Sequence, residues 1–329
     1  MAPVPGRAVA CLTLVEPPTN SEPKVSDMPD SAAIPATTTY RMTSLAWAVA
    51  VQSATDTLRG EAGVDLSGDS PGPEGSVPAG LDEPTRSGIA SELHTAGITD
   101  AAGKVQPQWL RALGQAATAP IRVSLVSRSG GLSTHCRVDL FGGRGIAVAF
   151  TRPVATAAEG RVAAIDVADV VTVTLLSEAV LWPVMARWIP QFPEMTAGGE
   201  SPQAGTGDSG PVPGRDGATT TLSAADVAAL AGGGDAGVPP DVAAAVAAAK
   251  ATVYLEVQSR AAGAGLPYRA AGVWAFSDSL YSVRTTGPAT ARRLVMVETA
   301  SGDIARQLVW HVLGAHDFLA RRTSAEPAS

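Results

Sequence analysis

The sequence predicts an α+β fold, a pseudo-two-fold repeat of two similar halves that share a central antiparallel β-sheet with helices packed on it. Three observations carry this prediction. Apolar residues alternate in short runs that are joined by Gly-rich turns, as in β-hairpins. Other segments repeat apolar residues at helical spacing. A stretch of the first half also reads like a stretch of the second, which indicates two similar structural units.

Three segments before the first alternating run are helical in character. Residues 43–59 predict a helix, or a strand that leads into one. Residues 81–98 predict a helix in which Ile89 and Leu93 lie four positions apart on one face. Residues 107–117 predict another helix, because the segment opens on a proline, a favoured first helical residue.

The period then changes from helical to alternating. The runs on either side of the GGRG tetrapeptide predict a hairpin, since glycines suit a tight turn between antiparallel strands. A β-branched run follows and leads into an apolar helix that Pro183 should bend or delay. The expected strands are 121–128, 135–141, 145–152 and 170–176, and the expected helix is 178–189.

The second half repeats this order. Residues 105–128 align with residues 238–260 after one deletion, with Pro107 matching Pro240. A strand, a polar turn and a strand then follow, and after them a strand and a helix that Gly314 should end. These later elements are expected over 269–285 and 292–313.

The division of the chain follows from these patterns. The start is rich in Pro, Thr and Ser and has no period, which predicts disorder. The joint between the halves is rich in Gly, Ser, Pro and Asp, which predicts a flexible linker. The expected parts are a disordered tail (1–42), a first half (43–193), a linker (194–222), a second half (223–320) and a disordered C-terminal tail (321–329).

Composition excludes several classes of partner. The 329 residues carry a net charge of −7, and no basic run exists, which argues against nucleic acid or an anionic membrane as partner. Cys11 and Cys136 form neither a disulfide framework nor a CxxC metal site, as in a reducing compartment. No apolar run reaches the length of a membrane span. We therefore expect a cytoplasmic protein with no membrane insertion, either a monomer or a homodimer.

One short stretch resembles a catalytic motif. GDSG followed by Pro is how the nucleophile loop of trypsin-like serine proteases reads, and it places Ser209 after His135 in the order used by that family. The alternative interpretation is therefore a serine hydrolase that uses Ser209 and His135. However, the motif lies in the aperiodic joint, with no neighbouring strands to hold a nucleophile. We expect no catalytic residues.

Other chemistry is equally unsupported. His311 and His316 lie five positions apart, off a shared helical face, so a metal site is not expected. The short Gly turns do not match the phosphate-binding loop pattern, so no cofactor is expected.

The remaining signal is apolar surface. The last two predicted helices carry large apolar residues on more than one face, which is typical of helices that lie between layers or in a contact with another chain. This leaves room for a groove that binds a partner helix. The candidate partner-binding residues are Trp274, Phe276, Trp310, Val312, Phe318 and Leu319.

The order of elements resembles the EspG chaperones of the ESX (type VII) secretion systems of actinobacteria. The resemblance is carried by residues 93–131, a helix, an AG-containing loop, a helix and a strand, together with the two-copy layout and the apolar helix that ends in WIP at 188–190. It spans about residues 43–192 and 222–320. No invariant signature is shared.

The resemblance implies a function without catalysis. EspG proteins are cytosolic, have a pseudo-two-fold α+β fold and bind the apolar tip of a helical PE–PPE pair, keeping it soluble for secretion. The implied partner is thus a secreted helical protein, of the PE–PPE type, the WXG type or another helical hairpin. Contacts in the family lie on the sheet face, hairpin loops and second-half helices. A third interpretation is a scaffold or regulatory protein with the same fold.

Overall fold

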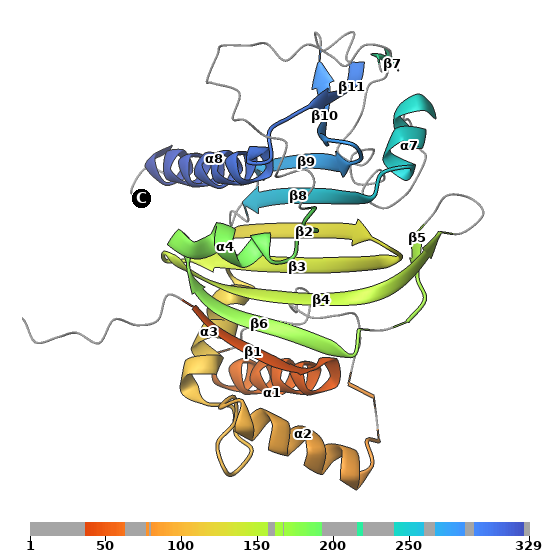
Figure 1. The fold of residues 1–329 in the computed structure, drawn as a ribbon. Coiled ribbons are helices and arrows are strands. Elements are labelled where there is room, and N and C mark those ends of the chain that lie inside the picture. The colour runs from red at the N-terminus through yellow and green to blue at the C-terminus, as the bar shows by residue number, and fades with distance from the viewer. Residues whose placement is uncertain are drawn as a thin grey trace, which may run out of the picture. The chain divides into compact units, whose positions relative to one another are not determined.

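Eleven strands of the described residues form one antiparallel sheet, which Figure 1 shows with the helices on it. The computed structural model describes residues 37–62, 77–78, 80–156, 162–166, 168–192, 216–219, 240–259, 267–286 and 293–325, all within the unit Ala36–Ser329. The strands are β1 (Thr37–Thr43), β2 (Ile121–Ser129), β3 (Leu132–Phe141), β4 (Arg144–Thr156), β5 (Val162–Ala164), β6 (Val170–Ser177), β7 (Asp216–Thr219), β8 (Ala251–Ser259), β9 (Arg269–Phe276), β10 (Leu280–Thr286) and β11 (Arg293–Glu298). The predicted α+β class and antiparallel sheet are confirmed.

The helices follow the predicted order. They are α1 (Ser44–Ala62), α2 (Glu83–Thr95), α3 (Pro107–Ala117), the 3-10 turn η1 (Glu178–Val180), α4 (Leu181–Ala186), α7 (Pro240–Ala247) and α8 (Asp303–Ala325). The repeat alignment matched Pro107 with Pro240, and these residues open α3 and α7. The prediction of a helix over 107–117 is confirmed to the residue.

Two tight turns of paired glycines close the hairpins of the first half. Gly142 and Gly143 join β3 to β4 with φ of 54° and 72°, and Gly130 and Gly131 join β2 to β3 with φ of 58° and 76°. Both φ values of each pair lie in the left-handed region, which a two-residue hairpin turn of this twist requires. A side chain at these positions would be strained, so the glycines fix the register of the first three central strands.

The sheet has the order β1-β6-β4-β3-β2-β8-β9-β10-β11-β7, and β5 pairs with β4. Strands β2 and β8 meet in the middle over nine residue pairs, from Ile121 opposite Ser259 to Ser129 opposite Ala251. Read outward from this central pair, each half places its strands in the same chain order. A pseudo-two-fold relation between the halves nevertheless stays a prediction.

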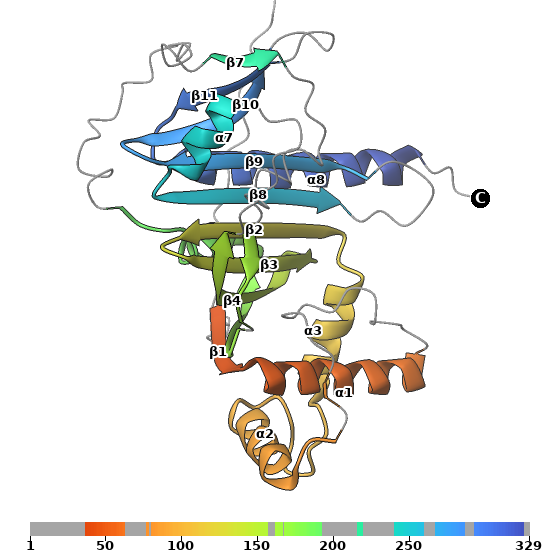
Figure 2. The ribbon, with the colours of Figure 1, turned by 90° about the vertical axis from the view of Figure 1, so that its right-hand side faces the viewer.

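The two faces of the sheet are covered by different helices. On one face, α4 and α8 pack on the central strands around Leu125, Leu255 and Val138. On the other face, α1, α2 and α3 bury Trp47, Trp109 and their neighbours at the β1 end. Helix α7 packs near Met296 and Tyr281 towards the β11 end. Figure 2 shows α1, α2 and α3 together beside β1, with α8 running along β8 and β9.

Two segments expected to lack regular structure contain strands. The expected disordered tail reached residue 42, but β1 begins at Thr37 and pairs along its whole length with β6. Its run of threonines favours a strand, and the Thr39 and Thr174 hydroxyls lie 3.1 Å apart across the pair. The expected linker contains β7, which pairs with β11. The rest of the expected tail and linker lies outside the described residues.

The last helix is longer than expected. Gly314 was expected to end it, yet α8 continues to Ala325 and so into the expected C-terminal tail. The reason is packing: a Cβ at Gly314 would overlap the Tyr268 hydroxyl, so the glycine makes room for a ring. Conversely, the helix expected over 178–189 is shorter, since α4 ends at Ala186 and tight turns lead on to Ile189.

Candidate interaction face

Helix α8 is held on the sheet by a stripe of apolar residues on its inner side. Ile304, Leu308, Val312 and Ala315 recur at helical spacing, and all four are buried in the central cluster with β8 and β9. Burying a large aliphatic side chain contributes on the order of 2 kcal/mol. The stripe thus fixes which side of the helix faces outward.

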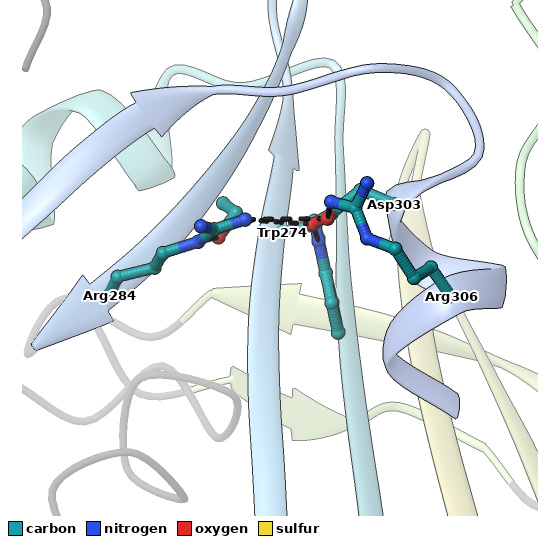
Figure 3. Close-up of polar contacts among 5 residues, drawn as sticks. Trp274, Arg284, Asp303 and Arg306 are labelled. Atoms are coloured by element: carbon teal, nitrogen blue, oxygen red, sulfur yellow. Dashed lines mark hydrogen bonds and ion pairs between the residues drawn. The ribbon is translucent and has the colours of Figure 1, made fainter. Parts of the chain in front are cut away.

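A buried carboxylate fixes the start of the helix. Asp303, which is fully buried, accepts a 2.9 Å hydrogen bond from Nε1 of Trp274 on β9. Its oxygens also lie 3.3 Å from the Arg284 guanidinium of β10 and bond to Arg306 one turn along the helix. Figure 3 shows both guanidinium groups pointing at this carboxylate from opposite sides. A carboxylate in the first turn also complements the helix dipole.

The C-terminal part of α8 is tied to two other elements. The Tyr268 ring lies 6.0 Å from the ring of Phe318, and it occupies the space that Gly314 leaves. His316 Nε2 lies 2.6 Å from Glu178 Oε1 of η1. Together with the buried stripe and Asp303, these contacts fix α8 along its length, so its outward face is a preformed surface.

The outward face of α8 carries a patch of exposed apolar side chains. Val309, Trp310 and Leu313 are 51 %, 66 % and 56 % exposed. In the described residues the other large apolar side chains with high exposure are Leu132 and Ile165. Three neighbouring apolar residues on one helix face are the usual sign of a contact with another protein, whereas a single exposed one is ordinary. We call Val309, Trp310 and Leu313 the α8 patch.

The structure separates the six candidate partner-binding residues. Trp274, Phe276 and Val312 are buried in the central cluster. Phe318 is half-buried beneath Arg322, and Leu319 is partly buried against the central cluster. Trp310 is the candidate that lies in the α8 patch.

Two residues of the patch were missed by the sequence analysis. Val309 and Leu313 lie one position after Leu308 and Val312, on the turn of the helix away from the inner stripe. A helical projection of the stripe would have identified them, because positions 309, 310 and 313 share the opposite face.

A second region of interest is a polar strip on the sheet face opposite α4 and α8. On β2 and β3, Asp139 is fully buried and accepts hydrogen bonds from Nε of Arg122 at 2.8 Å and of Arg137 at 2.9 Å. On β8, Glu256 accepts a 2.6 Å bond from the hydroxyl of Tyr254 and another from Arg269. The acidic groups of this strip are therefore paired within it.

His135 lies in the same strip, and its surroundings oppose protonation. Burial, with a smaller contribution from the nearby cations Arg152 and Arg128, lowers its pKa to about 4. The ring stacks on Phe150 at 5.0 Å, and Ser133 Oγ lies 3.0 Å from Nε2. A catalytic histidine needs a pKa near the working pH and an acidic group that orients it. The charges that act on His135 are both positive, so it is a poor general base.

The described residues contain no group of three or more His, Cys, Asp or Glu side chains arranged to hold a metal ion. Within the same residues, none of the helices has the length and apolar character needed to cross a membrane. Ser209 of the GDSG motif lies outside the described residues.

Comparison with known proteins yields one solved structure of interest. No protein-family model matches the chain, and no curated protein matches its sequence. Among solved structures, the chain is similar to the Mycobacterium tuberculosis type VII secretion system chaperone EspG5 in its complex with a PE25–PPE41 dimer. The match has a TM-score of 0.43 and 10 % identity, and it covers 84 % of this chain and 94 % of that chain. Similarity of this degree does not assign the chain to a family.

Proposed function

We propose that the protein is a cytosolic, non-enzymatic secretion chaperone that binds the apolar tip of a helical secreted protein through the α8 patch. The observation that carries the proposal is the exposure of Val309, Trp310 and Leu313 on a helix whose opposite side is packed on the sheet. An apolar helix tip aggregates in water, and a complementary apolar surface keeps it soluble until it is released. The resemblance of residues 93–131 to EspG chaperones points to type VII secretion.

A helical partner suits the shape of this surface. The patch residues are spaced at i, i+1 and i+4, so they form a ridge along one face of α8. Ridges of one helix pack into the grooves of another, and apolar helices are commonly recognised in this way. The partner would be a helical pair of the PE–PPE type or another helical hairpin. We expect binding on the order of micromolar to nanomolar, which is tight but reversible.

We also propose that the two halves are copies related by a pseudo-two-fold axis. The strand order from β2 and β8 outward, and the placement of α4 and α8 on one face with α3 and α7 on the other, support this. On this proposal α8, of 23 residues, occupies the place that α4, of 6 residues, has in the first half. The length of α8 is then an addition specific to the second half, and it is this addition that carries the patch.

The surroundings of His135 support a binding protein over the serine hydrolase that Ser209 and His135 would form. Reaction of the purified protein with a fluorophosphonate probe, which labels reactive serines, tests this directly. We expect no labelling of Ser209, and labelling that the Ser209→Ala variant abolishes would contradict the proposal.

Co-expression tests the chaperone function. The chain would be produced with helical secreted proteins encoded beside it in its genome, and the soluble yield of each partner would be measured. We expect a partner that is insoluble alone to become soluble and co-purify with the chain, and we expect Trp310→Asp and Leu313→Asp to abolish this. The matched control is Ile165→Asp, because Ile165 is 67 % exposed and lies just after β5. An equal soluble yield of the partner with all three variants would show that the α8 patch is not the surface that binds it.

A further inference from the structure

The apolar residues on the exposed face of α8 are flanked by side chains of unlike charge. Arg306, Trp310, Leu313 and Asp317 recur at i, i+4, i+7 and i+11 and so form one line along the helix. Arg306 bonds to the buried Asp303, yet its side chain remains 56 % exposed. Asp317 forms an exposed pair with Arg321, at 2.7 Å, which in water contributes little and leaves the carboxylate accessible. The apolar residues thus lie between the cation Arg306 and the carboxylate of the exposed Asp317–Arg321 pair.

A surface with this layout is complementary to itself. When a second α8 is laid antiparallel on the first, Arg306 of each copy faces Asp317 of the other. Trp310 of each copy then faces Leu313 of the other, and the apolar residues lie at the centre. A two-fold interface requires such self-complementarity, because each residue pair occurs twice. In a parallel arrangement, by contrast, like charges would face each other at both ends.

We propose that two copies of this chain pair through the outward faces of α8, antiparallel and about a two-fold axis, and so cover the α8 patch. The pairing is inferred from the layout of charged and apolar residues on α8 and does not depend on the proposed function. That it competes with substrate rests on the proposed function, since both would use the same patch. The chaperone would then protect its own apolar surface until a partner displaces the second copy.

The expected dimer is weak. Stable interfaces bury about 800 Å² on each partner, and one line of side chains on one helix covers less than that. We therefore expect a dissociation constant in the micromolar range or above. A weak dimer is consistent with this role, because the substrate has to displace the second copy from the α8 patch.

Sedimentation velocity of the purified full chain, without any partner, tests the pairing. We expect the sedimentation coefficient to rise with concentration over the micromolar range. We expect Trp310→Asp to weaken the dimer about tenfold or more, as is usual for a central tryptophan. Asp317→Arg, which places like charges opposite each other, should weaken it about threefold or more. Ile165→Asp should leave it unchanged. The proposal would be overturned if the chain were a monomer at all concentrations, or if Ile165→Asp weakened the dimer and the two α8 variants did not.

Disulfide cross-linking tests the antiparallel register. The Cys11→Ser chain serves as background, because burial raises the pKa of the remaining Cys136 to about 12 and leaves its thiol unreactive. Leu313→Cys lies near the two-fold axis and should link to itself under mild oxidation. Asp317→Cys lies far from the axis and should not. Self-linking of Asp317→Cys, or failure of Leu313→Cys to link where sedimentation shows a dimer, would overturn the antiparallel arrangement.

The two proposals fail separately. A chain that is monomeric in sedimentation but solubilises its partner through Trp310 refutes the pairing and leaves the chaperone function intact. A chain that pairs through Trp310, while Trp310→Asp still solubilises the partner fully, refutes the assigned substrate site and leaves the pairing intact.

Discussion

The tryptophans of the two halves are used in opposite ways. Trp109 of α3 is 1 % exposed, donates a 3.1 Å hydrogen bond from Nε1 to the Gly97 carbonyl, and meets the rings of Tyr40 and Trp47 edge-on. Trp310 of α8 is 66 % exposed. Each residue lies in an amphipathic helix that packs on the same sheet.

The difference lies in their position relative to the inner stripe of each helix. Trp109 precedes Leu113 and Ala116 at i, i+4 and i+7, on the buried face. Trp310 falls between Leu308 and Val312 and therefore points away from the sheet. Composition alone cannot separate a core tryptophan from a surface one. The angular position of the tryptophan around the helix, relative to the apolar stripe, can separate them.

The largest effect on stability is expected for the buried tryptophan. Trp109→Ala removes a fully packed ring and its hydrogen bond, and should lower the free energy of unfolding by about 4 kcal/mol. Urea unfolding followed by circular dichroism measures this. A loss below about 1 kcal/mol would mean that the contacts with Tyr40 and Trp47 do not hold the first-half core together.

The next largest effect is expected at the anchor of α8. Asp303→Ala leaves Trp274 Nε1 and two guanidinium groups without their shared acceptor, and should cost about 3 kcal/mol. Asp303→Asn keeps an acceptor but loses the charge, and should cost roughly half as much. Amide exchange in residues 303–309 should rise in the same order. Equal loss in the two variants would show that the charge, and not the tryptophan bond, fixes the helix.

Much of the fold could be predicted because its signals are local. Proline at the start of α3 and α7, paired glycines in the hairpin of Gly142 and Gly143, and alternation along β2 each specify their element without tertiary information. The strands missed are β1, β5 and β7; β1 and β7 are the edges of the sheet, and the short β5 pairs only with β4. Edge strands form by backbone pairing with a neighbour that only the tertiary structure supplies, so periodicity alone does not identify them.

The candidate site was only partly predictable. Trp310 could be nominated from its size, but Trp274 and Phe276 were nominated with it although the sheet buries them. Strand residues give no local indication of which face a helix will cover. Likewise, Gly314 looked like a helix end because the ring of Tyr268, far away in sequence, could not be anticipated.

The polar strip should contribute a pH dependence that the α8 patch does not. The pKa of His135 is about 4 in the folded chain and 6.5 when unfolded, so the unfolded chain binds more protons between these values. Stability should therefore fall as pH drops from about 6.5 to about 4, by roughly 2 kcal/mol from this residue. His135→Gln should remove that part of the slope in urea unfolding at several pH values. His94→Gln, at an exposed position of α2, is the control, and a matching loss of slope there would refute the assignment to His135.

The smallest expected effect completes the comparison of the two tryptophans. Trp310→Ala removes a ring that is already largely in water, so the free energy of unfolding should change by less than about 0.5 kcal/mol. This should hold at concentrations below those at which two copies pair, because pairing would add stability to the unmodified chain. Urea unfolding of both variants at one low concentration makes the measurement. A loss above about 1 kcal/mol in dilute solution would place Trp310 in a packed core, and the patch could then no longer serve as a free surface. A neutral result, together with the large loss at Trp109, would mean that stability does not require an exposed tryptophan at this position, which leaves binding as the reason for its exposure.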